Sequence, residues 1–202
     1  LKEFLTTRIR VLILFIITLF NSCSDEESLN QDKINLELLN SLNDVFDSGK
    51  KLMAMTNGLN ELELHNGNQE ILFIAVHGKG SRGYEWIYPL NVINDENNLI
   101  SFFRWNDNSC INSSIKLLDD SIKDRLKKYK NIEKVILFGH SYGGLLTASF
   151  MDQWTGEIPL EVHSIASPLK GLDSISFFCE YKIPKKVPTK STFYEWRTNS
   201  FT

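Results

Sequence analysis

The sequence has 202 residues, of which 42% are hydrophobic and 23% are charged, and these proportions fit one folded domain and exclude a mainly disordered chain. The 25 Asp and Glu side chains outnumber the 22 Lys and Arg side chains, which gives a net charge of -3. A chain without a basic excess does not neutralise a phosphate backbone, so no nucleic-acid partner is expected. Three cysteines are too few for a disulfide scaffold or a four-ligand zinc site. We therefore expect no metal or cofactor, and any chemistry must come from side chains.

The N-terminal segment has the layout of a secretory signal. Basic residues between Lys2 and Arg10 precede an apolar run from Val11 to Phe20, and Cys23 follows shortly after that run. The run is shorter than the about 20 apolar residues that a membrane-spanning helix needs. This order of features resembles a bacterial lipoprotein signal, which implies that residues 1–22 are removed and that the thiol of Cys23 receives a lipid. An ordinary signal peptide with an incidental cysteine is the alternative.

The expected lipidation has consequences for location and for domain organisation. It implies an exported protein of the bacterial cell envelope that is attached to a membrane through a lipid anchor. Residues 23–50 are expected to form a polar tether and a helix, which spans Leu36 to Phe46, and residues 51–202 the folded domain. Cys110 and Cys179 then remain, and in an oxidising compartment they can pair if the fold brings them within bonding distance.

Short apolar runs predict strands along the folded domain. Uninterrupted apolar residues extend from Ile71 to Val76, as in a strand covered on both faces, and Leu99 to Phe103 and Val135 to Phe138 have the same character. Leu160 to Ala166 is a weaker candidate, and Thr192 to Thr198 is rich in β-branched and aromatic residues. The domain is therefore expected to contain a sheet with both faces covered.

A helix is predicted between the second and the third of these strands. Apolar residues recur at three- and four-residue spacing from Ile115 to Tyr129, with Asp119 and Asp120 early and Lys127 and Lys128 late, which suits the helix dipole. Strands that alternate with helices imply right-handed crossovers between parallel strands. The predicted fold class is therefore α/β, with a mostly parallel sheet and helices on both faces.

The most specific motif follows the third predicted strand. Residues 139–144 read Gly-His-Ser-Tyr-Gly-Gly, and an apolar helix pattern comes next. A G-x-S-x-G sequence between a strand and a helix is typical of a sharp turn that presents a serine hydroxyl. The helix N-terminus adds partial positive charge beneath that hydroxyl. Ser141 is therefore predicted to be a nucleophile, in a turn shaped by Gly139, His140 and Gly143.

With this motif the chain resembles the α/β-hydrolase family, in particular its lipase- and esterase-like members, over about residues 60 to 200. Residues 76–79, Val-His-Gly-Lys, end the first predicted strand, where these members place the second half of an oxyanion hole. The resemblance implies that the backbone N–H groups of Lys79 and Tyr142 hold the developing oxyanion, and each such donor is worth about 10² to 10³ in rate. It also implies a hydrolase that cleaves carboxylic esters, small or lipid, through an acyl-Ser141 intermediate.

The loop after the first predicted strand also fits a rival motif. Residues 78–83 match G-x-G-x-x-G, the dinucleotide fingerprint, and Asp107 lies beyond the next strand, near where a ribose-binding acid belongs. A phosphate site needs a helix that starts at these glycines. Pro89 is expected to stop such a helix within about two turns, because its ring clashes with the preceding turn and it lacks an N–H. The dinucleotide interpretation is therefore disfavoured.

The catalytic base is not identified by the sequence. A serine hydroxyl needs a base within hydrogen-bond reach, and the family takes it from a histidine late in the chain, in the order Ser, acid, His. His65, His77 and His140 all precede Ser141, and His163 lies inside a strand run. A structural role is the better prediction for each of the four.

The catalytic acid is equally open. Asp173 and Glu180 follow the fourth predicted strand, where a minority of lipase-like members carry their acid, although solvated loop carboxylates are the commoner explanation. In the family the acid commonly follows the seventh strand and the histidine an eighth, so both are expected beyond Thr202, together with the last strand. The chain is then a fragment of a longer serine hydrolase. The alternatives are a truncated inactive product and a non-catalytic binding lipoprotein.

Overall fold

The computed structural model describes residues 34–41, 44–170, 179, 181 and 184–197. These residues belong to a compact unit that starts at Ile34. The expected signal segment, residues 1–22, and the expected lipidation site, Cys23, lie outside the described residues. No helix within the described ranges combines the length and the apolar character that a membrane crossing needs.

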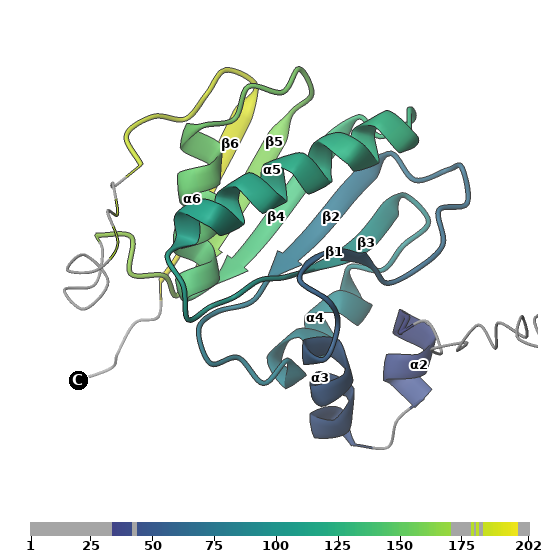
Figure 1. The fold of residues 1–202 in the computed structure, drawn as a ribbon. Coiled ribbons are helices and arrows are strands. Elements are labelled where there is room, and N and C mark those ends of the chain that lie inside the picture. Colours follow the sequence, from purple (N-terminus) through teal and green to yellow (C-terminus); the bar gives the residue numbers. More distant parts are fainter. Residues whose placement is uncertain (1–33, 42–43, 171–178, 180, 182–183, 198–202) are drawn as a thin grey trace, which may run out of the picture. The chain divides into compact units, whose positions relative to one another are not determined.

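A mixed sheet, shown in Figure 1, forms the centre of the unit. In chain order its strands are β1 (Gly58–Glu61), β2 (Ile71–Val76), β3 (Asn98–Arg104), β4 (Lys134–His140), β5 (Leu160–Ile165) and β6 (Ser191–Trp196). Their spatial order is β1-β3-β2-β4-β5-β6. Only the pairing of β1 with β3 is antiparallel among the described strands, and all the others are parallel. The predicted mostly parallel α/β sheet is confirmed.

Helices cover both faces of this sheet (Figure 1). Their bounds are α2 (Leu36–Ser41), α3 (Val45–Met53), α4 (Tyr84–Val92), α5 (Ile111–Lys128) and α6 (Tyr142–Asp152). The side chains of β2 alternate between the two layers: Leu72 and Ile74 pack with α5 and α6, whereas Phe73 and Ala75 pack with α2, α3 and α4. This burial on both sides explains the uninterrupted apolar run.

The predicted helix from Leu36 to Phe46 is wrong in its extent, because two helices occupy this region. Asp44 has an extended backbone, with φ of -123°, and its carboxylate accepts a hydrogen bond from the N–H of Phe46, so it caps a new helix, α3. The short α2 ends at Ser41. Helix α3 then passes through the expected domain boundary between residues 50 and 51 and buries Leu52 in the core.

The expectation that Pro89 stops a helix is also wrong. Helix α4 begins after Gly83 and continues past Pro89, its sixth residue, to Val92. Proline removes one backbone hydrogen bond and crowds the preceding turn. Trp86, Ile87 and Leu90 are all buried in the core beneath α4, and this packing offsets the cost.

Candidate functional site

Ser141 lies at a sharp turn between β4 and α6. Its backbone has φ of 52° and ψ of -118°, a conformation that costs an ordinary residue free energy. The N–H of Ser141 donates to the carbonyl oxygen of Ile165 at 2.9 Å, which ties the turn to the end of β5. The Ser141 side chain is half-buried, and its hydroxyl makes no hydrogen bond with a described residue.

The glycines around Ser141 are required by close packing. A Cβ on Gly139 would lie 2.5 Å from Oγ1 of Thr147, and one on Gly143 would lie 2.4 Å from the carbonyl oxygen of Val76. Both distances are far below van der Waals contact. The first turn of α6 can therefore approach β2 and β4 this closely only because these positions have no side chain.

The turn after β2 borders the nucleophile candidate. A Cβ on Gly78 would lie 3.1 Å from the Cβ of Ser141, so the two turns are in contact. Lys79 is exposed, and its backbone N–H donates no hydrogen bond within the described part of the chain. Tyr142 is the first residue of α6, so its N–H has no partner inside the helix. Each of the two turns therefore has a backbone N–H without a partner among the described residues, on the residue after Gly78 and on the residue after Ser141.

His77 is a buried structural residue in this turn. Its Nδ1 lies 2.9 Å from the carbonyl oxygen of Gly78, and its Nε2 faces Nη1 of Arg104 at 2.6 Å and the N–H of Trp105 at 3.3 Å. These partners assign the proton to Nδ1 and an acceptor role to Nε2. Burial lowers the pKa of His77, and the nearby Arg104 charge acts in the same direction. The ring therefore stays neutral and joins the ends of β2 and β3.

His163 is engaged at both ring nitrogens, away from Ser141. The strand register places it opposite Phe138, three residues before Ser141. Its Nε2 contacts a carboxylate oxygen of Glu161 at 2.7 Å, and its Nδ1 accepts from the indole N–H of Trp196 at 3.1 Å. Burial opposes ionisation of Glu161, but hydrogen bonds from His163 and Lys134 outweigh it and lower the Glu161 pKa.

The other two histidines also have structural contacts. The ring of His65 stacks on Tyr129, with centroids 4.2 Å apart, and its Nδ1 accepts from the N–H of Gly67. His140 precedes Ser141 and lies beside Gly78. None of the four histidines hydrogen-bonds to Ser141, and the acid candidates Asp173 and Glu180 lie outside the described residues.

The dinucleotide fingerprint has a different role in the structure. Gly80 and Gly83 do adopt positive φ, 67° and 82°, and α4 does start after Gly83. However, the N–H of Gly80 donates to Oδ2 of Asp107 at 2.6 Å. A carboxylate at this donor repels a phosphate, so the loop is not a dinucleotide site. From the sequence Asp107 was considered only as a ribose-binding acid beyond the next strand, and its hydrogen bond to Gly80 was not predicted.

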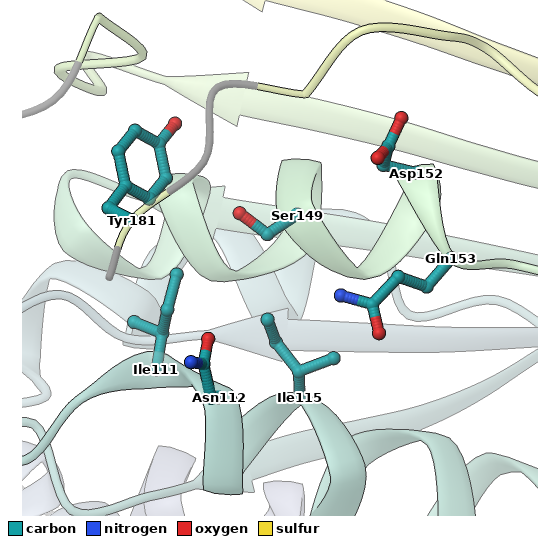
Figure 2. Close-up of a pocket in the computed structure, with 7 residues that line it drawn as sticks. All are labelled: Ile111, Asn112, Ile115, Ser149, Asp152, Gln153 and Tyr181. Carbon is teal, nitrogen blue, oxygen red and sulfur yellow. The ribbon is translucent and has the colours of Figure 1, made fainter. Parts of the chain in front are cut away.

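The cavity in Figure 2 has a volume of about 260 Å³ and lies between α5 and α6. It is lined by Ile111, Asn112, Ile115, Ser149, Asp152, Gln153 and Tyr181. Ser149 follows Ser141 by eight residues, which is about 12 Å along a helix, so this cavity is separate from the nucleophile candidate. Burial raises the pKa of Tyr181 to about 12, and its neutral hydroxyl donates to the carbonyl oxygen of Leu169. Among the described residues, no three His, Cys, Asp or Glu side chains are grouped to hold a metal ion.

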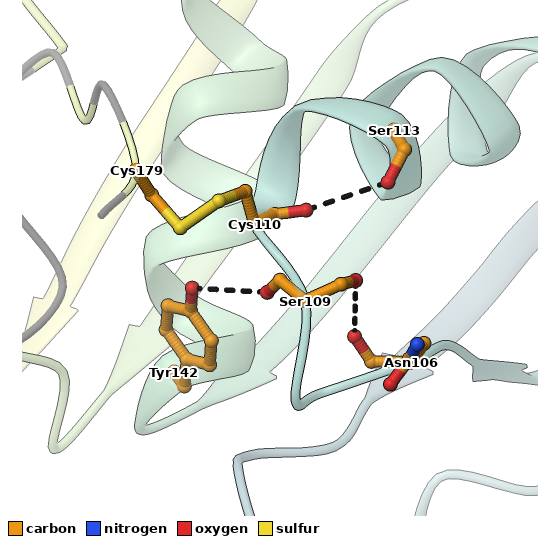
Figure 3. Close-up of a disulfide and its surroundings, with 6 residues drawn as sticks. All are labelled: Asn106, Ser109, Cys110, Ser113, Tyr142 and Cys179. Carbon is orange, nitrogen blue, oxygen red and sulfur yellow. Dashed lines mark hydrogen bonds between the residues drawn. A yellow bond between two sulfur atoms is a disulfide. The ribbon is translucent and has the colours of Figure 1, made fainter.

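A disulfide joins Cys110 to Cys179, the two cysteines whose pairing the sequence left dependent on the fold (Figure 3). Cys110 caps the N-terminus of α5. The preceding residue, Ser109, accepts a hydrogen bond from the phenol of Tyr142 at 3.4 Å (Figure 3). The peptide bond from Cys110 to Ser109 and the hydrogen bond from Tyr142 to Ser109 therefore connect the bridge to the turn that contains Ser141.

Comparisons with known proteins find similar solved structures at low sequence identity. No family model and no curated protein matches the chain. Similar solved structures include a monoacylglycerol lipase from Paleococcus ferrophilus, 22% identical with a TM-score of 0.41 over 52% of this chain and 43% of that chain. Another is the lin2722 gene product of Listeria innocua, 19% identical with a TM-score of 0.41 over 60% of this chain and 62% of that chain. The chain thus spans less than two thirds of either structure, and its α/β fold class rests on its own strands and helices.

The depressed pKa of His77 predicts a loss of stability in acid. The unfolded chain takes up a proton on this histidine as pH falls through about 6.5, whereas the folded chain resists protonation. The free energy of unfolding should therefore decrease between about pH 7.5 and pH 5.5. Urea titrations at the two pH values measure this decrease. The His77→Gln variant has no titrating ring at this position, so its free energy of unfolding should decrease less between the same two pH values. An NMR titration of the His77 ring with a midpoint above 6.5 would contradict the assignment.

The disulfide predicts a stability difference between oxidised and reduced protein. Cys110 and Cys179 are 69 residues apart, and a bridge over such a loop stabilises by about 4 kcal/mol, because it restricts the unfolded chain. The double variant Cys110→Ser with Cys179→Ser should therefore unfold at lower urea concentration. Reductant should lower the midpoint of the natural protein to that of the variant and leave the variant unchanged. Equal midpoints throughout would show that the bridge does not form.

Proposed function

We propose that this protein is a serine hydrolase that cleaves carboxylic esters through an acyl-Ser141 intermediate. The observation that carries the proposal is the strained turn at Ser141, φ of 52°, with a hydroxyl free of hydrogen bonds to described residues. The backbone N–H groups of Lys79 and Tyr142 have no hydrogen-bond partner among the described residues, Tyr142 follows Ser141 directly, and Lys79 follows Gly78, which lies against Ser141. Backbone strain of this kind has a cost, which a purely structural serine would not need.

The chemistry follows from these groups. Oγ of Ser141 attacks the ester carbonyl carbon, and the carbonyl electron pair moves to oxygen. The N–H groups of Lys79 and Tyr142 stabilise that oxyanion, with the N-terminus of α6 adding partial positive charge. The carbon–alkoxide bond then breaks, and the proton lost by Ser141 reaches the leaving alcohol through a general base. Water hydrolyses the acyl-serine by the same steps. The base and the acid are assigned to no described residue.

A non-catalytic binding lipoprotein on the same scaffold is the second candidate. One observation favours it: none of the four histidines, all of which the structure describes, hydrogen-bonds to Ser141, and both nitrogens of His77 and of His163 already have partners. Without a base, a serine hydroxyl is a poor nucleophile. The two candidates differ in whether Ser141 reacts, which an active-site probe measures directly.

We also propose that the protein is exported and anchored through a lipid on Cys23. The charged, apolar and cysteine segments of the first 23 residues support this proposal. The bridge between Cys110 and Cys179 supports it too, because disulfides persist in oxidising compartments and are rare in the cytosol.

The hydrolase proposal predicts that Ser141 reacts with a fluorophosphonate. The full-length protein should become labelled in a gel assay and should hydrolyse p-nitrophenyl butyrate. Ser141→Ala should abolish the label and reduce turnover by on the order of 10⁶, to the background rate. Ser113→Ala, which alters an exposed hydroxyl on α5, is the matched control and should keep both signals.

Thermal unfolding checks that Ser141→Ala remains folded. Label on Ser141→Ala would assign the nucleophile to another residue. A folded natural protein that takes no label and cleaves no ester would refute the hydrolase proposal and favour the binding lipoprotein.

The anchoring proposal predicts that Cys23 carries fatty acid. Cells that express the natural sequence with labelled palmitate should yield labelled protein in the membrane fraction. Cys23→Ser should remove the label and release the protein, because only a thiol at the cleavage point is acylated. Cys110→Ser is the control and should keep the label. Membrane-bound, labelled Cys23→Ser protein would refute the proposal.

A further inference from the structure

We propose that Asp107 is a positioning residue for the oxyanion hole, holding the turn at residues 77–80 so that the N–H of Lys79 stays beside Ser141. This inference rests on the proposed hydrolase function. It assigns a role to an acidic residue that lies 27 positions from its hydrogen-bond partner, Gly80.

The outer part of the turn is held by few contacts. The inner part is fixed by packing, since a Cβ on Gly78 would meet both His140 and Ser141. Lys79 and Gly80 are exposed, and a Cβ on Gly80 would meet no atom within 4 Å. Gly80 therefore has no neighbour for a side chain to pack on, and hydrogen bonds hold it and the adjoining Lys79 in position.

Asp107 supplies the strongest of those hydrogen bonds. Its Oδ2 accepts from the N–H of Gly80 at 2.6 Å, and a bond to a charged acceptor is stronger than one between neutral groups. The backbone bond across the turn is longer: the N–H of Ser81 donates to the carbonyl oxygen of Gly78 at 3.4 Å. The Ser81 hydroxyl is bonded to Glu85 and to the N–H of Gly83, which hold the far side of the turn. Loss of the carboxylate should therefore release Gly80, and Lys79 with it.

Asp107 is itself held in place by the end of β3. The guanidinium of Arg104 donates through Nε to the carbonyl oxygen of Met53 at 3.0 Å and faces His77 through Nη1. The indole N–H of Trp105 donates to the carbonyl oxygen of His77 at 2.9 Å. The residues just before the turn that contains Asp107 are therefore held by hydrogen bonds. The hydrogen bond from Gly80 to Asp107 then links the turn after β2 to the turn after β3.

Two effects of Asp107 on an oxyanion oppose each other. Its negative charge disfavours a second negative charge nearby, although the Arg104 guanidinium lies close enough for the two charges to interact. Its hydrogen bond to Gly80 favours the oxyanion by keeping the donor in place. Asp107→Asn removes the charge but keeps an acceptor oxygen, whereas Asp107→Ala removes both, so the pair of variants separates the two effects.

The experiment measures reactivity and backbone exchange in the full-length protein. Asp107→Ala should react with fluorophosphonate about 10- to 100-fold more slowly, because the donor is misplaced, with a lower kcat and little change in KM for p-nitrophenyl butyrate. The amide hydrogen of Gly80, followed by NMR, should exchange about tenfold faster, in line with the loss of one charged hydrogen bond. Asp107→Asn should restore both values to within about threefold of the natural protein, since an amide oxygen still accepts.

Asp95→Ala is the matched control. Asp95 also accepts a hydrogen bond from a turn N–H, that of Asn97, but lies before β3, at the opposite end of the strand. This variant should leave the reactivity and the Gly80 exchange unchanged. Thermal midpoints verify that all three variants are folded.

The possible failures are distinguishable. A natural protein that does not react refutes the hydrolase proposal, and the role of Asp107 in that reaction falls with it. A reactive natural protein with an equally reactive Asp107→Ala refutes the positioning role alone. Unchanged exchange of Gly80 in Asp107→Ala also refutes it, whatever the reactivity. An Asp107→Ala variant that reacts faster than the natural protein would mean that the charge of Asp107 outweighs its hydrogen bond, which likewise overturns the inference.

Discussion

The close approach of α6 to the ends of β2 and β4 is the constraint on which the candidate site depends. A Cβ on Gly143 would lie 2.4 Å from the carbonyl oxygen of Val76, so backbone meets backbone with no side chain between. The chain can cover the short path from β4 to α6 only by a tight turn, and Ser141 therefore takes its strained φ of 52°. Ser141 is the N-cap of α6, so it immediately precedes the first N–H groups of that helix, which have no partner inside the helix.

The sheet register brings the other parts of the site to this turn. Val76, the last residue of β2, is paired with Phe103 on one side and Gly139 on the other. Because these three strands are parallel, the turns that follow them lie side by side at the carboxyl ends of the strands. The neutral ring of His77 and the carboxylate of Asp107 then connect the turns after β2 and β3. The buried ring of His77 has partners at both nitrogens, which orders the turn after β2.

Strand β6 is less completely buried than the central strand β2. Tyr194 and Trp196 of β6 are 43% and 54% exposed, so aromatic rings here lie partly in solvent. His163 stacks between Phe138 and Tyr194 and uses both ring nitrogens to bind Glu161 and Trp196. These contacts explain why a histidine inside a predicted strand is structural. A late histidine in the sequence was a candidate base by its order alone, and its packing removes it from that role.

The sequence by itself determined the strands and the helix that have a strong hydrophobic pattern, and the motif around Ser141, whose residues are adjacent in the chain. The apolar runs of β2, β3 and β4, the amphipathic α5 and the strand-turn-helix around Ser141 were all predicted, because each depends on residues close in sequence. Strand β1 has only one buried residue, and α4 contains a proline, so tertiary packing alone decided them. Packing also decided the pairing of Cys110 with Cys179 and the bond from Gly80 to Asp107. Contacts between residues so far apart leave no local pattern, since only the assembled sheet brings them together.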